Sequence, residues 1–95
     1  MKILISKSVR EKLAEKHQGV SADELRQCFA NREGPLLIDS RATHMTNPLT
    51  RWFIAETDFG RELKIAFMPM PDGTIVIKTA YEPNAVETAI YRGKI

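Results

Sequence analysis

In the middle of the segment from Arg51 to Tyr81, Leu63, Ile65 and Phe67 alternate with Glu62, Lys64 and Ala66. Alternation with a period of two is typical of a β-strand that has one buried face and one exposed face. Two short segments, Asp58–Gly60 and Pro71–Gly73, lie on either side of this stretch and contain the glycine and proline residues that tight turns favour. The pattern therefore predicts three consecutive antiparallel strands joined by two hairpin turns.

Capping signals and apolar residues at helical spacing predict three helices. Ser8 and Glu11 have the spacing of a capping box, and Ser21 and Glu24 repeat it. The predicted helices run from about Val9 to Lys16, from Ser21 to about Asn31, and onward from Asn84.

The last helix, which Asn84 can cap, has its apolar residues at positions that share one face. These residues are Ala85, Val86, Ala89 and Ile90. We expect them to form the buried side of the helix. Glu87 and Thr88 are then expected to face the solvent, with Tyr91 at the rim.

Two further segments, Lys2–Ile5 and Leu36–Asp39, are short and apolar, and the first is expected to be an edge strand or an extended arm. The polar segment from Ser40 to Pro48 predicts a loop. The element order is then β-α-α-β-β-β-β-α. This order predicts an α+β domain in which an antiparallel sheet of four or five strands has helices packed on one face. A chain of 95 residues suits a single domain, residues 1–95, with one core.

Turn lengths set the expected register of the sheet and sort its side chains onto two faces. The expected pairs are Phe53 with Ile65, Ala55 with Leu63, Phe67 with Ile77, and Ile65 with Thr79. The face expected to meet the helices carries Phe53, Ala55, Leu63, Ile65, Phe67 and Ile77. The opposite face, called the outer face below, carries Trp52, Ile54, Glu56, Glu62, Lys64, Met68, Val76 and Lys78.

The outer face mixes an aromatic ring, lysines and carboxylates, and such a surface suits RNA. Lysine and arginine hold phosphates, an exposed Trp52 can stack on a base, and a carboxylate or lysine can move a proton. A water-facing sheet that carries lysine and glutamate in cross-strand pairs has the same composition. In that alternative the Ser40–Pro48 loop covers Trp52.

The net charge and the few cysteine and histidine residues limit which functions are expected. A net charge of +2 permits a phosphate-bearing partner without demanding one. The single cysteine, Cys28, lies on the apolar face of a predicted helix and is expected in the core of a cytoplasmic protein. The only histidines, His17 and His44, lack neighbouring metal ligands, so we expect no metal or cofactor. We also expect neither a membrane span nor an export signal, since no long apolar run is present.

Three motifs, in this order, resemble the BrnT family of bacterial type II toxins, within the RelE/ParE-like group. They are Lys16–Ser21 leading into Glu24 and Phe29, Asp58–Leu63, and Ile75–Ala80 followed by Glu87 and Tyr91. The resemblance extends over residues 9 to 92, nearly the whole chain. It implies a RelE/BrnT-like fold and a metal-independent endoribonuclease that uses the 2′-hydroxyl of RNA as its nucleophile. It also implies a cognate antitoxin protein as partner, in a homo- or hetero-oligomer.

The resemblance carries Arg61, from the second motif, to the role of phosphate ligand. This chain has Tyr81 where the family pattern has arginine, and a tyrosine can still contact phosphate or donate a proton. The composition of the outer face adds Glu56 as the candidate base, with Lys64 and Lys78 as acid or phosphate ligands. The residues expected to bind RNA are Arg51, Trp52, Arg41 and His44.

A second function class fits the same fold. A non-catalytic protein-binding module would use the apolar members of the outer face as a partner patch. These members are Trp52, Ile54, Met68 and Val76.

Overall fold

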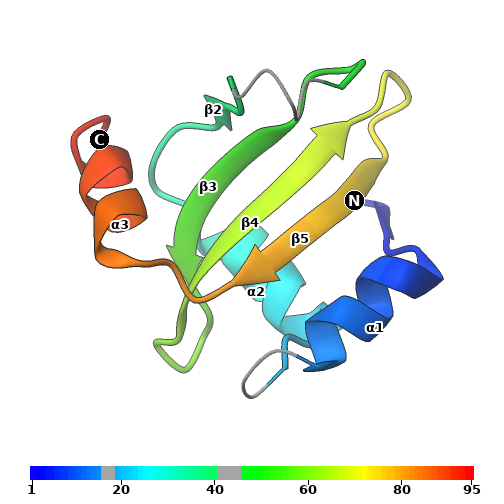
Figure 1. Ribbon diagram of the computed structural model, residues 1–95, viewed down its shortest axis with the longest axis horizontal. Helices are drawn as coiled ribbons and strands as arrows, with labels where there is room; N and C mark the ends of the chain where they lie inside the picture. Colours follow the sequence, from blue (N-terminus) through cyan, green and yellow to red (C-terminus); the bar gives the residue numbers. More distant parts are fainter. Residues whose placement is uncertain (16–18, 41–45) are drawn as a thin grey trace.

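The structure is a computed structural model that describes residues 1–15, 19–40 and 46–95. Within these ranges the chain forms a five-stranded sheet and three helices, an α+β architecture (Figure 1). The elements are β1 (Ile3–Leu4), α1 (Lys7–Glu15), α2 (Ala22–Asn31), β2 (Leu37–Ile38), β3 (Arg51–Glu56), β4 (Glu62–Pro69), β5 (Ile75–Tyr81) and α3 (Ala85–Arg92). The predicted element order is confirmed.

The sheet is mixed rather than antiparallel. Its strand order is β1-β5-β4-β3-β2, and β1 pairs with β5 in parallel, with Ile3 opposite Ile75. The prediction of an antiparallel sheet is therefore wrong at this edge, although the other strand pairs are antiparallel. A two-residue strand carries no pattern that fixes its direction, so only its distant partner decides which way it runs.

Helices lie on both faces of the sheet, so the prediction that they share one face is wrong. Phe29 of α2 meets Phe53 and Phe67 edge to face, with ring centroids 4.9 and 5.2 Å away. Tyr91 of α3 instead meets Trp52 of the outer face, at 5.7 Å between centroids. In Figure 1, α2 (cyan) passes behind the sheet, while α3 (red) lies apart from the other helices, near β3.

The register of β3 and β4 agrees with the prediction, and the register of β4 and β5 agrees only in part. Phe53 pairs with Ile65, and Phe67 pairs with Ile77, as expected. A shift between Ala66 and Phe67 then pairs Ile65 with Ala80 rather than with Thr79. Counting from a turn cannot detect such an irregularity. Its consequence is that Tyr81 lies opposite Lys64.

The core lies between the inner face of the sheet and helices α1 and α2. Its fully buried side chains include Leu25, Cys28, Phe53, Leu63, Ile65, Phe67 and Ile77. Cys28 is in the core, as expected, and burial raises the pKa of its thiol to about 11. In the described part of the chain, no helix has the length and apolar character that a bilayer span needs.

Candidate functional site

The C-terminal helix α3 turns its apolar side to the solvent, which is the reverse of the prediction. Val86 is 68% exposed and Ile90 is 50% exposed, whereas Tyr91 is only 3% exposed. Glu87, one turn before Tyr91, also faces the sheet, because side chains four residues apart share a helix face. The helix therefore offers a carboxylate and a phenol ring to the outer face of the sheet.

Glu87 performs two tasks with its two carboxylate oxygens. Its Oε1 accepts the backbone N–H of Asn84 at 3.0 Å, while the Asn84 side chain accepts the N–H of Glu87, so the pair forms a capping box. Its Oε2 lies 2.7 Å from the Nζ of Lys64 on β4. A buried lysine left without an anion would be costly, and Glu87 supplies that anion while Val86 and Ile90 stay exposed.

Lys64, Tyr81 and Glu87 form one hydrogen-bonded group, called the Lys64 cluster below. Tyr81 Oη donates to Glu87 Oε2 at 2.6 Å, and Lys64 Nζ donates to Tyr81 Oη at 3.3 Å. The β4–β5 register brings Lys64 and Tyr81 opposite each other, and α3 supplies Glu87. The cluster thus combines a cation, a phenol and a carboxylate within hydrogen-bond distance.

Aromatic rings surround the ammonium group of the cluster. Lys64 Nζ lies 4.6 Å from the centre of the Trp52 ring and 5.6 Å from that of Tyr81. Both distances are within the range of a cation–π contact. The ammonium group therefore contacts two aromatic rings and the carboxylate of Glu87.

A cavity of about 570 Å³ opens beside the cluster. Trp52, Lys64 and Glu87 line it together with residues of β2 and the end of α3. A larger hollow of about 790 Å³ lies between the end of α2, the β3–β4 hairpin and α3. Both linings mix carboxylates with cationic side chains, and the cavity beside the cluster is the one that also contains the Trp52 ring.

The pKa values of the cluster assign its protons at neutral pH. Burial alone would raise the pKa of Glu87, but hydrogen bonds from Lys64 and Tyr81 outweigh burial and lower it. Burial, and then the hydrogen bond to Glu87, raises the pKa of Tyr81. Glu87 is therefore a carboxylate and Tyr81 a protonated phenol, which is the state in which a phenol can donate a proton.

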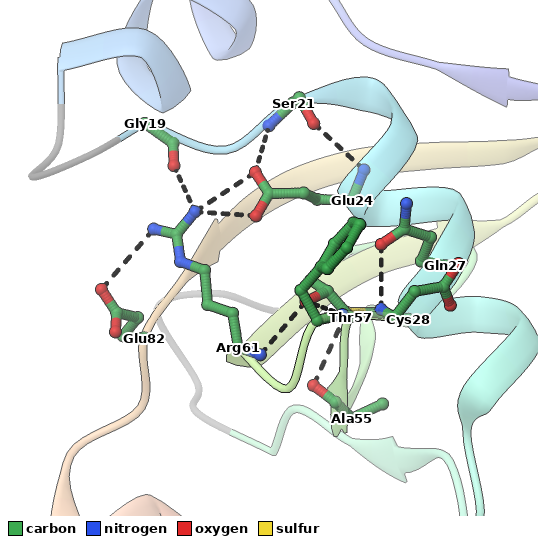
Figure 2. Close-up of polar contacts among 11 residues, drawn as sticks. Gly19, Ser21, Glu24, Gln27, Cys28, Ala55, Thr57, Arg61 and Glu82 are labelled. Carbon is green, nitrogen blue, oxygen red and sulfur yellow. Dashed lines mark hydrogen bonds and ion pairs between the residues drawn. The ribbon is translucent and has the colours of Figure 1, made fainter.

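Arg61, predicted as the main phosphate ligand, has protein partners (Figure 2). Its Nη1 donates to the carbonyl of Gly19 at 2.6 Å and lies 3.0 Å from Glu24 Oε2, and its Nη2 lies 3.5 Å from Glu82. The Arg61 side chain is 18% exposed. Arg61 therefore ties the start of β4 to the start of α2 and to the segment before α3.

The remaining predicted residues are spread over the fold. Glu56 is exposed at the end of β3, opposite Glu62, and Lys78 is exposed on β5 where the register shifts. Arg51 begins β3 and is half-buried. Arg41 and His44 lie outside the described residues. Of the predicted residues, the structure brings Lys64, Tyr81 and Trp52 together.

Glu87 was missed as a site residue because the apolar pattern of α3 placed it in the solvent. Its capping-box spacing from Asn84 fixed its position in the helix, but this spacing says nothing about the packed side. Its spacing of four residues from Tyr91 was the available signal, since a buried Tyr91 requires Glu87 to face the sheet as well.

Comparison of the chain with protein-family models, with curated proteins and with solved structures gave no match. The resemblance to BrnT-like toxins therefore remains a prediction from the three motifs, and the Lys64 cluster has to be interpreted from its own chemistry.

Proposed function

We propose that this chain has a RelE/BrnT-like fold and is the toxin component of a bacterial toxin–antitoxin module, with RNA as its target and a cytoplasmic site of action. Support comes from one observation above all, the Lys64 cluster beside Trp52. It combines an ammonium group for phosphate charge, a protonated phenol and an indole ring on one face of the sheet. Each of these groups has a use in RNA binding or cleavage.

The proposed reaction is metal-independent cleavage by the 2′-hydroxyl of the RNA. This oxygen attacks the adjacent phosphorus, the bond from phosphorus to the 5′-oxygen breaks, and a 2′,3′-cyclic phosphate forms. Glu56, two positions along β3 from the residue that pairs with Lys64, takes the 2′-hydroxyl proton. Tyr81 gives a proton to the leaving 5′-oxygen. The ammonium group of Lys64 stabilises the negative charge that develops on the phosphate oxygens.

Arg61 has a different role in this proposal from the one its motif implied. Because its guanidinium binds Gly19 and Glu24, we assign it to holding the sheet against α2. The phosphate role passes to Lys64. Trp52 provides a stacking surface for a base, and a cognate antitoxin protein is the expected partner.

Inducible expression in a bacterial host tests the proposal, with growth and total RNA followed over time. The wild type is expected to arrest growth and cleave RNA, and Lys64→Ala is expected to abolish both effects. Lys12→Ala, an exposed lysine of α1, is the matched control and should behave as wild type. Cleavage that persists in a folded Lys64→Ala variant would exclude the assigned site.

A non-catalytic protein-binding module is the second candidate, and the outward apolar side of α3 favours it. The patch predicted for this role is partly covered, since Ile54 is only 8% exposed. Val86 and Ile90, together with the exposed Ile38 of β2, would form the contact surface instead. Binding measured at increasing salt concentration distinguishes the two candidate functions. RNA binding weakens steeply as the salt concentration rises, whereas an apolar protein contact does not.

A further inference from the structure

We infer that α3 occupies the place of a bound nucleotide on the outer face and so inhibits the protein's own RNA binding. In this arrangement Glu87 lies where a phosphate would lie, and Tyr91 lies where a base would stack. The inference rests on the proposed function in naming RNA as the ligand, and it adds the regulation of that site.

Glu87 Oε2 lies among donors that suit a phosphate oxygen. Lys64 Nζ at 2.7 Å and Tyr81 Oη at 2.6 Å both donate to this single oxygen. A phosphate oxygen accepts charge-assisted hydrogen bonds from the same donor types. Lys64 and Tyr81 come from the sheet, so these two donors remain in place when α3 moves away.

Tyr91 of α3 contacts the ring of Trp52 on the outer face. The two rings lie 5.7 Å apart between centroids with their planes inclined at 47°. The tilted Tyr91 ring thus covers the Trp52 ring, which is the surface on which a nucleobase would stack. Because Glu87 and Tyr91 share one helix face, α3 presents an anion and a flat ring side by side, the same two groups that a nucleotide presents.

The structure of α3 suits a helix that can leave the sheet. It has eight residues, fewer than an isolated helix needs to be stable, so its contacts with the sheet maintain it. Those contacts use Glu87 and Tyr91, while Val86 and Ile90 face the solvent. The helix also follows the last strand, so its displacement leaves the pairing of the five strands intact.

The Tyr91 side chain packs tightly against Gly34. A Cβ at position 34 would lie 2.5 Å from Tyr91 Oη, and this oxygen donates to the carbonyl of Pro35 at 2.7 Å. Gly34→Ala therefore pushes Tyr91 out of its seat without changing any residue of the Lys64 cluster. It provides a second route to displace α3, independent of Glu87.

The test measures binding separately from cleavage. The probe is a short single-stranded RNA with 2′-O-methyl groups, which cannot be cut by its own 2′-oxygen. Trp52 is the only tryptophan in the chain, so its fluorescence reports on the outer face. Four proteins are compared: the wild type, Glu87→Gln, Gly34→Ala, and the control Glu11→Gln, which makes the same charge change on an exposed position of α1.

We expect Glu87→Gln and Gly34→Ala to bind the probe about 5-fold or more tightly than the wild type, a size typical of coupled equilibria. Glu11→Gln should match the wild type. Unchanged or weaker binding by both α3 variants, with circular dichroism showing folded protein, would overturn the inference. If one variant fails to fold, the other decides.

Cleavage of unmodified RNA tests the proposed function independently of the inhibitory role of α3. Cleavage by the wild type with no tightening in either α3 variant would leave the nuclease proposal standing and reject the inhibitory role of α3. Tighter probe binding without cleavage by any variant would support the role of α3 and reject the nuclease proposal. Loss of cleavage in Glu87→Gln at unchanged probe affinity would make Glu87 a reacting group and overturn the inference.

Discussion

Arg61 Nη1 lies 3.0 Å from Glu24 Oε2, and this ion pair joins the start of β4 to the first turn of α2. Glu24 also accepts the N–H of Ser21 at 3.0 Å, so its carboxylate completes a capping box and binds Arg61 at the same time. Burial alone would raise the pKa of Glu24, but the hydrogen bonds from Ser21 and Arg61 lower it. The pair is thus part of the packing between helix and sheet.

Arg61→Ala is expected to lower the free energy of unfolding by about 1–3 kcal/mol, because a partly buried carboxylate and the Gly19 carbonyl lose their donor. Urea denaturation measures the loss. The control is Arg26→Ala, since Arg26 pairs with Asp23 on the exposed surface and should change stability by less than about 0.5 kcal/mol. Equal stability of Arg61→Ala and wild type would contradict the structural role and would again make Arg61 a candidate phosphate ligand.

The contribution of Glu87 to stability is expected to depend on pH. Its pKa is lower in the folded protein than in the unfolded chain, so it stabilises the fold above its unfolded pKa and loses this effect as pH falls through the folded pKa. The difference in unfolding free energy between wild type and Glu87→Gln should be largest at neutral pH and shrink below about pH 4.5, the ordinary value for the group. Urea denaturation over a pH series measures it, and a difference that does not vary with pH would argue against the pairing with Lys64.

Gly34→Ala is expected to release α3 while the rest of the fold stays ordered. The added methyl group clashes with the Tyr91 ring, and overpacking of this kind costs about 1–3 kcal/mol. Hydrogen exchange should quicken in α3 and stay unchanged in α2. Gly93→Ala is the control, because its Cβ would meet only ordinary contacts at 3.5 Å and its φ of −66° suits alanine. Unaltered exchange in α3 would show that Tyr91 does not hold the helix.

Two neighbouring residues of α3 test which side of the helix is packed. Tyr91→Ser is expected to cost about 3–5 kcal/mol, as truncations of large buried rings do, because Tyr91 is 3% exposed. Ile90→Ser should change stability by less than about 0.5 kcal/mol, since Ile90 is half exposed. Thermal or urea unfolding gives both values, and the reverse ranking would mean that α3 packs through its apolar side.

The amino-acid sequence by itself determined the local features of the fold. Turn residues at Asp58–Gly60 placed the first hairpin, and its length fixed the pairing of Phe53 with Ile65. The capping spacing of Ser21 with Glu24 placed the start of α2. These features depend on residues close in sequence, where steric preferences and short hydrogen bonds act within a few positions.

The candidate site could be predicted only in part for the same reason. Trp52 and Lys64 were assigned to one face by alternation along β3 and β4, and the structure places them 4.6 Å apart, from Nζ to the ring centre. Tyr81 joins them because of the register shift in β5, which no local pattern records. Glu87 joins them because α3 packs on the sheet through Glu87 and Tyr91, and the carboxylate then pairs with the buried Lys64.

Only the tertiary structure decided the direction of β1, the register shift in β5 and the packed side of α3. Each depends on a contact between residues far apart in the chain, such as Ile3 with Ile75 or Lys64 with Glu87. The hydrophobic pattern of a helix predicts which residues would be buried if apolar packing alone determined its orientation. In α3, the charge on Lys64 and the seat for Tyr91 beside Gly34 and Pro35 decide instead.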